Sequence, residues 1–97
     1  MPGPIRGRIV TVLDARGLLC PLPVLRLRKQ LLALPQGAIV RLIATDRMAM
    51  VDVPHFCEQA GHVMVGTRDL GDGALEFTVR RGPSVPQAEG LVTPEDS

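Results

Sequence analysis

The cysteine at position 20 is the side chain whose type and surroundings are best suited to chemistry. It stands in the segment Leu19-Cys20-Pro21-Leu22-Pro23. Proline is favoured at the first position of a helix, because its fixed φ suits the helix and its missing N–H would be unpaired there. Pro21 therefore predicts a helix start, with Cys20 on or beside the N-cap. The helix dipole lowers the pKa of a thiol at that place and favours the nucleophilic thiolate, so the motif predicts a reactive cysteine.

A purely structural interpretation of both cysteines stands beside this one. Free cysteine is among the most buried residue types and packs as a small hydrophobe. The flanking prolines favour the reactive interpretation for Cys20. Cys57 instead shares an apolar helix face with Val53, Phe56 and Ala60, and we expect it in the core. Its alternative role is a resolving thiol for Cys20, although the spacing is not that of a Cys-x-x-Cys motif.

The remaining polar residues offer little catalytic machinery. His55, His62 and the two cysteines do not have the spacing of a structural zinc site, so we expect no metal and no cofactor. The sequence lacks a Ser/His/Asp arrangement and a Gly-rich phosphate-binding motif. Asp46 follows a predicted strand, which is where α/β folds place site residues, and it is a candidate for partner binding. Its alternative role is to cap the next helix.

Composition limits the class of protein and its surroundings. The 97 residues support one domain, and 45% of them are apolar, which is ordinary for a globular protein. A net charge of +1 argues against bulk electrostatic binding of nucleic acid or of an anionic membrane. No apolar stretch approaches the ~20 residues of a membrane span. Two cysteines are too few for a disulfide scaffold, so we expect a reducing cytoplasm.

The hydrophobic pattern predicts four strands and two helices. Asp52 is the expected N-cap of the second helix, with Pro54 in its first turn, an earlier turn over 48–51 and Gly61 at its end. Asp72-Gly73 favours a hairpin turn. The expected elements, in chain order, are a strand over 8–13, a helix over 21–34, a strand over 38–44, a helix over 52–60, and strands over 62–67 and 74–80.

The order βαβαββ predicts an α/β (α+β) fold, a two-layer α/β sandwich with a four-stranded mixed sheet and both helices on one face. The domain is expected over 8–81, with a flexible start over 1–7 and a disordered tail over 82–97. In the last strand, Leu75, Phe77 and Val79 alternate with Glu76, Thr78 and Arg80, which predicts one buried face and one solvated face.

The first helix carries two apolar stripes. One consists of Val24, Leu27, Leu31 and Leu34 and can face the sheet. The other consists of Leu25 and Leu32, with Arg28 between the stripes, so burying both would trap a charge. Either Arg28 reaches solvent along its own stem, or Leu25 and Leu32 are partly exposed. The second option makes Leu25, Arg28, Lys29 and Leu32 a docking patch. The cations near Cys20, including Arg26, would favour a thiolate, dock an acidic partner, or form a solvated basic face.

These motifs together resemble a known family. The segments Asp14–Pro23, Arg28-Lys29, Asp52–Cys57 and Gly61-His62 are similar to those of the TusA/SirA sulfur-carrier family, and the resemblance runs from about residue 8 to 80. It implies a fold like the C-terminal domain of a bacterial translation initiation factor. The sequence departs from many members at Leu22, where they have a polar or charged residue between the two prolines, and at Asp46-Arg47, where they have Asp-Pro after the second strand.

The resemblance also implies a function. Cys20 would accept sulfane sulfur as a persulfide and pass it on, with Pro21 and Pro23 holding its loop and helix start, and Arg28 and Lys29 on the docking helix. The donor would be a cysteine desulfurase or a rhodanese-type protein, and the acceptor a protein of tRNA thiolation, cofactor synthesis or sulfur oxidation. The protein would be a covalent carrier rather than an enzyme.

Two other function classes remain open at this point. The first is a non-covalent regulatory module that binds RNA or protein, although the low charge and 2% aromatic content weigh against RNA. The second is a thiol–disulfide redox protein that uses Cys20 and Cys57.

Overall fold

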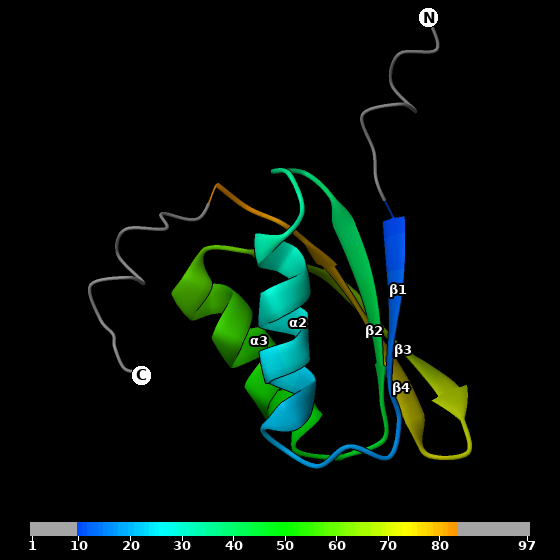
Figure 1. Ribbon diagram of the computed structural model, residues 1–97. Helices are drawn as coiled ribbons and strands as arrows, with labels where there is room; N and C mark the ends of the chain where they lie inside the picture. The colour runs from blue at the N-terminus through cyan, green and yellow to red at the C-terminus, as the bar shows by residue number, and fades with distance from the viewer. Residues whose placement is uncertain (1–9, 84–97) are drawn as a thin grey trace, which may run out of the picture.

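Two helices lie against one face of a four-stranded sheet in the computed structural model, which describes residues 10–83 (Figure 1). The order is the expected βαβαββ, and the two-layer prediction is confirmed. The elements are β1 (Val10–Ala15), α2 (Leu22–Leu32), β2 (Ile39–Ala44), α3 (Ala49–Ala60), β3 (Val63–Gly71) and β4 (Ala74–Arg80).

The sheet is mixed and has the strand order β1-β2-β4-β3. The pair β1 and β2 is parallel, with Ala15 opposite Ala44, whereas β4 is antiparallel to both of its neighbours. Ala44 in turn pairs with Leu75 at the start of β4. The loop after β1, the loop after β2 and the β3–β4 turn therefore meet at one end of the sheet (Figure 1). The loop after β1 contains Cys20.

The core between the helices and the sheet is almost entirely aliphatic. Leu27 and Leu31 of α2, Leu42 of β2, Val53 of α3 and Phe77 of β4 are all buried. Burying each large apolar side chain stabilises a fold by roughly 1.5–3 kcal/mol. This layer fixes where the helix starts lie relative to the sheet.

The first helix is shorter than expected, and its start is displaced by one residue. Pro21 is the N-cap itself, α2 begins at Leu22, and Pro23 occupies the first turn, where its missing N–H has no helical partner. Cys20 therefore precedes the cap, and the peptide that joins it to Pro21 is cis. The helix ends at Leu32 rather than residue 34, because Ala33 takes up its C-cap position.

The second helix begins at Ala49, so it includes the earlier turn expected over 48–51, and Asp52 is not its N-cap. Met48 is the N-cap, and Asp52 lies in the first turn. Asp46 supplies the side-chain hydrogen bond at this end of the helix, because its Oδ1 accepts from the Met48 N–H at 3.0 Å. Gly61 closes α3 with φ 83°, a left-handed conformation that glycine adopts freely, as expected.

The β3–β4 hairpin turns at Asp72 and Gly73, both with positive φ, which confirms the turn predicted from this pair. In β4, Glu76 was expected on the solvated face, but it is only 8% exposed. Arg68 on β3, 3.3 Å away, and Arg41 on β2, 3.9 Å away, form ion pairs with its carboxylate. Side chains of the neighbouring strands therefore bury Glu76, which the alternation of the sequence predicts to be exposed.

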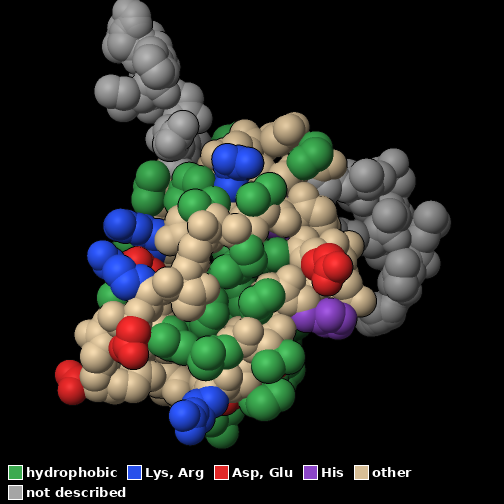
Figure 2. All heavy atoms as spheres, turned by 180° about the vertical axis from the view of Figure 1, so that it is seen from behind, with side chains coloured by type: hydrophobic (Ala, Val, Ile, Leu, Met, Phe, Trp, Pro, Cys, Tyr) green, Lys and Arg blue, Asp and Glu red, His purple; other side chains and the backbone are tan. Residues whose placement is uncertain are grey.

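The surface seen from behind carries many hydrophobic side chains, with charged side chains grouped mainly at its margins (Figure 2). Exposed hydrophobic residues of the described chain include Val63, Val65 and Leu70 of β3. Within residues 10–83, neither helix is both long and apolar enough to cross a membrane.

Both ends of the described domain lie at the end of the sheet away from Cys20. Val10 starts β1 at the level of Ile39, and Arg80 ends β4 at that same level. The expected segment 1–7 and most of the expected tail fall outside the described residues. Gly82 is described and buried, and its N–H donates to His62 Nδ1 at 3.1 Å. A Cβ at Gly82 would come within 1.8 Å of the Gly61 carbonyl oxygen.

Candidate functional site

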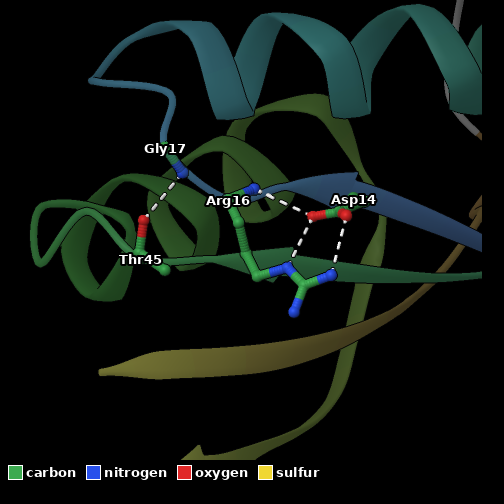
Figure 3. A network of polar contacts seen from close by, with 4 residues as sticks. All are labelled: Asp14, Arg16, Gly17 and Thr45. Atoms are coloured by element: carbon green, nitrogen blue, oxygen red, sulfur yellow. Dashed lines mark hydrogen bonds and ion pairs between the residues drawn. The ribbon is translucent and has the colours of Figure 1, made fainter. Parts of the chain in front are cut away.

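The loop from β1 to Cys20 is held by contacts within itself and to the neighbouring loop. Arg16 folds back on Asp14, with an Nη2–Oδ2 distance of 2.9 Å (Figure 3). Hydrogen bonds from Arg16 lower the pKa of Asp14 to about 2. The Gly17 N–H donates to Thr45 Oγ1 at 2.9 Å, which ties this loop to the end of β2. Cys20 is thus presented on an anchored turn.

Two carboxylates contact Cys20 from the second half of the chain. Its thiol donates a hydrogen bond to Asp52 Oδ2, from the first turn of α3. Its backbone N–H donates to Asp46 Oδ2 at 2.5 Å. The other oxygen of Asp46 accepts from the Met48 N–H, so one carboxylate holds both loops together. The hydrogen bonds from Met48 and Cys20 lower the pKa of Asp46 and keep it ionised.

The charge state of Cys20 differs from the expectation. Its pKa is raised to about 11, first by the hydrogen bond to Asp52, then by burial, and then by the negative charges of Asp52 and Asp46. The predicted lowering by the helix dipole is therefore wrong for the free protein. Cys20 lies outside the helix, one residue before its cap, whereas the Asp52 carboxylate is in direct contact with the sulfur, so the effect of the carboxylate exceeds that of the dipole.

The other predicted site residues fall into two groups. Pro21 caps α2, and Pro23 is buried in its first turn, so both lie beside Cys20 together with Asp46. The predicted docking patch lies along α2 and is exposed: Leu25 is 51% exposed, Leu32 is 42% exposed, and Arg28 and Lys29 are also exposed. Of the two alternatives for this helix, the one with exposed leucines is therefore confirmed.

Cys57 lies in the core, as expected. Only 2% of it is exposed, and burial raises the pKa of its thiol to about 11. Both cysteines are free thiols.

The structure adds features that the sequence pattern did not indicate. Leu19, Leu22 and Met48, on the two loops and at the start of α2, are respectively 70%, 48% and 51% exposed, and form an apolar rim near Cys20. The sequence pattern predicts Asp52 as a helix cap and does not predict its contact with Cys20. One sequence feature could have indicated the contact. Asp52 is an acidic residue in the first turn of α3, and α3 starts at the same end of the sheet as the loop that contains Cys20.

A hollow lies on each side of α2. One of about 550 Å³ lies between α2 and β1, with Leu25, Arg26 and Lys29 among its lining residues. The other, of about 280 Å³, lies between α2 and α3 and includes Asp52. Its full lining is Pro21, Val24, Asp52, His55, Phe56 and Gln59. Within residues 10–83, no three His, Cys, Asp or Glu side chains are grouped so as to hold a metal ion.

A family model described as sulfurtransferase TusA matches residues 11–81. The chain belongs to the TusA family. Among similar family members, the sulfur carrier protein TusA of Pseudomonas savastanoi pv. phaseolicola is 37% identical over 84 residues, covering 86% of this chain and 99% of that protein. The sulfur carrier protein TusA of Allochromatium vinosum is 38% identical over 69 residues, covering 71% of this chain and 90% of that protein.

The fold of this TusA family member is also similar to a solved structure. The crystal structure of a SirA-like protein from Desulfitobacterium hafniense matches with a TM-score of 0.68 and 26% sequence identity. The match covers 74% of this chain and 97% of that chain. The family predicted from the cysteine–proline motif and the segments around it is therefore confirmed.

Proposed function

We propose that this protein carries sulfane sulfur as a persulfide on Cys20, from a sulfur-donor protein to an acceptor protein. The observation that carries the proposal is the half-buried Cys20 thiol on an anchored loop, near an exposed apolar rim. Two relatives named as sulfur carrier proteins TusA support the same function.

The transfer needs no oxidant. The Cys20 thiolate attacks the terminal sulfur of a persulfide on the donor's cysteine, and a new sulfur–sulfur bond forms. The donor's own sulfur–sulfur bond breaks, and its cysteine leaves as a thiolate that takes up a proton. The acceptor's thiolate later attacks the terminal sulfur on Cys20 in the same way. The protein is a carrier in this scheme and has no small-molecule turnover of its own.

The partners dock, in this proposal, on the exposed faces around Cys20. The patch of Leu25, Arg28, Lys29 and Leu32 offers apolar area and positive charge, which suits an acidic partner surface. The donor is a cysteine desulfurase or a rhodanese-type protein. The acceptor belongs to tRNA thiolation, cofactor synthesis or sulfur oxidation. Two free thiols fit a reducing cytoplasm.

Intact-mass spectrometry after incubation with a cysteine desulfurase and cysteine tests the proposal. Wild-type protein gains one sulfur atom, Cys20→Ala gains none, and Cys57→Ala gains one at the wild-type rate. Absence of the adduct on wild type contradicts the proposal. Loss of loading in Cys57→Ala favours a thiol–disulfide redox protein, and full cellular activity of Cys20→Ser favours a non-covalent binding module.

A further inference from the structure

The carboxylate that contacts the reactive sulfur comes from a different helix and adjoins a hollow of its own. Building on the carrier function proposed above, we infer that Asp52 holds Cys20 unreactive in the free protein. A lysine or arginine of the sulfur-donor protein, seated in the hollow between α2 and α3, engages the Asp52 carboxylate and frees the thiol to react.

The contact itself selects the unreactive form of Cys20. A thiol is a donor to a carboxylate, which only accepts hydrogen bonds, so the Cys20–Asp52 contact requires the proton to stay on sulfur. A thiolate at the same place would be repelled by the negative charge of Asp52. It would also be repelled by the charge of Asp46, whose carboxylate accepts the hydrogen bond from the Cys20 backbone N–H. The nucleophile in sulfur transfer is the thiolate. The free protein therefore holds its cysteine in the form that does not attack.

The hollow beside Asp52 is suited to one kind of occupant. Pro21, Val24 and Phe56 give it apolar walls, and Asp52 gives it a carboxylate. Lysine and arginine combine an apolar stem with a charged tip, and so match walls and carboxylate together. His55 is the other titratable side chain among its lining residues, which include no lysine or arginine. A cation from a partner thus finds the Asp52 carboxylate without a lysine or arginine beside it among the residues that line the hollow.

Occupation of the hollow converts the resting thiol into the nucleophile. When a cation binds the carboxylate, Asp52 stops accepting from the thiol and its charge is offset, so the thiolate becomes easier to form. The thiol proton passes to solvent. The Cys20 sulfur then bonds to the terminal sulfur of the donor persulfide, and the donor's cysteine leaves as a thiolate. Donor docking and the exposure of a reactive cysteine are coupled through one side chain.

The first test is the pH profile of Cys20 alkylation by iodoacetamide, followed by peptide mass spectrometry on the full chain. In wild type the rate rises with a midpoint near pH 11. In Asp52→Asn, which removes the charge and keeps the shape, the midpoint falls by at least about one unit. The rate at pH 8 then rises about threefold per unit, because a less basic thiolate is also a weaker nucleophile. Glu58→Gln, which removes a charge elsewhere on α3, leaves the midpoint unchanged. Equal midpoints for wild type and Asp52→Asn overturn the inference.

The second test places a cation in the hollow by mutation. Gln59→Lys adds one positive charge to the lining, whereas Glu58→Gln makes the same change in net charge at an exposed position that does not line the hollow. Gln59→Lys lowers the alkylation midpoint and Glu58→Gln does not. An unchanged midpoint in Gln59→Lys overturns the role of the cation.

A third measurement covers the case in which Asp52→Asn fails to fold, as judged by far-ultraviolet circular dichroism. Infrared spectroscopy of the wild-type S–H stretch then shows a hydrogen-bonded band that is absent from Cys20→Ser, which retains only the Cys57 band. Absence of such a band overturns the inference. If wild type loads sulfur and Asp52→Asn keeps the wild-type midpoint, only the control by Asp52 is refuted. Wild type that never loads sulfur refutes the carrier function itself.

Discussion

Cys20 illustrates what a sequence motif can and cannot predict about a single residue. The prolines at 21 and 23 placed the thiol beside a helix start, and the structure has it there, one residue before the cap. They could not predict its charge state, because the dominant contact is with Asp52, which is 32 residues away in the chain. Local geometry was predictable, and the electrostatics that depend on a distant segment were not.

A second residue, Asp46, allows a prediction about how the two loops are held. Its carboxylate accepts from the backbone N–H groups of Cys20 and Met48, and so connects two loops. Asp46→Ala leaves both N–H groups without this acceptor, and we expect their amide hydrogens to exchange faster with solvent. Hydrogen exchange followed by mass spectrometry measures the effect. Amides within β2 are the internal control, and unchanged exchange in peptides spanning 16–21 and 46–50 would contradict the prediction.

At the scale of elements, α2 has one buried and one exposed apolar face. The stripe with Leu27 and Leu31 is buried against the sheet, while Leu25 and Leu32 stay exposed beside Arg28. Periodicity alone left open whether the second stripe was buried. The structure resolves this because a two-layer fold offers only one sheet face, and the charge of Arg28 stays in water when Leu25 and Leu32 remain outside.

Substitution of one leucine on each face of α2 tests the buried and the exposed face separately. Leu27→Ala removes a fully buried side chain, and we expect the free energy of unfolding to fall by roughly 2–5 kcal/mol. Leu25→Ala alters a side chain that is 51% exposed and changes stability by less than about 0.5 kcal/mol. If the patch on α2 binds partners, Leu25→Ala slows sulfur loading by the donor protein while loading by inorganic polysulfide is unchanged. Urea unfolding and intact mass report the two effects. If Leu25→Ala loads sulfur as fast as wild type from the donor protein as well as from polysulfide, Leu25 is excluded from the docking surface.

For the whole molecule, element order and layer arrangement were predictable, and exact boundaries less so. The strand over Ala74–Arg80 and the turn at Asp72-Gly73 match the prediction, because alternation and turn residues are local signals. The N-cap predicted for α3, Asp52, was wrong, whereas the earlier turn over 48–51 and the alternative role of Asp46 as a cap are confirmed. Asp52 and Asp46 both suit a helix start, and only the folded loops decide between them. The prediction that Glu76 is exposed was wrong, because arginines on two neighbouring strands form ion pairs with it.

Alkaline pH should destabilise the whole fold. Burial raises the pKa of the Cys57 thiol from its ordinary 9.0 to about 11. Between these values the unfolded chain has lost the thiol proton and the folded chain still holds it, so the free energy of unfolding falls as pH rises. The loss from Cys57 reaches roughly 2 kcal/mol by pH 11. Cys20 contributes in the same direction, and the sequence contains no tyrosine to obscure the effect.

Urea unfolding at pH 8, 9, 10 and 11 measures this dependence. Cys57→Ala is the control, and its stability falls less steeply over the same range. A wild-type stability that is constant up to pH 11 would contradict the burial of an uncharged Cys57 in the folded state.

The position of the chain ends has a practical consequence. The first strand enters and the last strand leaves at the pole remote from the reactive sulfur. A tether attached where the chain enters at Val10 or leaves at Arg80 therefore lies at the pole opposite Cys20 and leaves the cysteine pole facing the medium. The same polarity suits genetic fusion, because the chain enters and leaves the described domain on the side opposite Cys20.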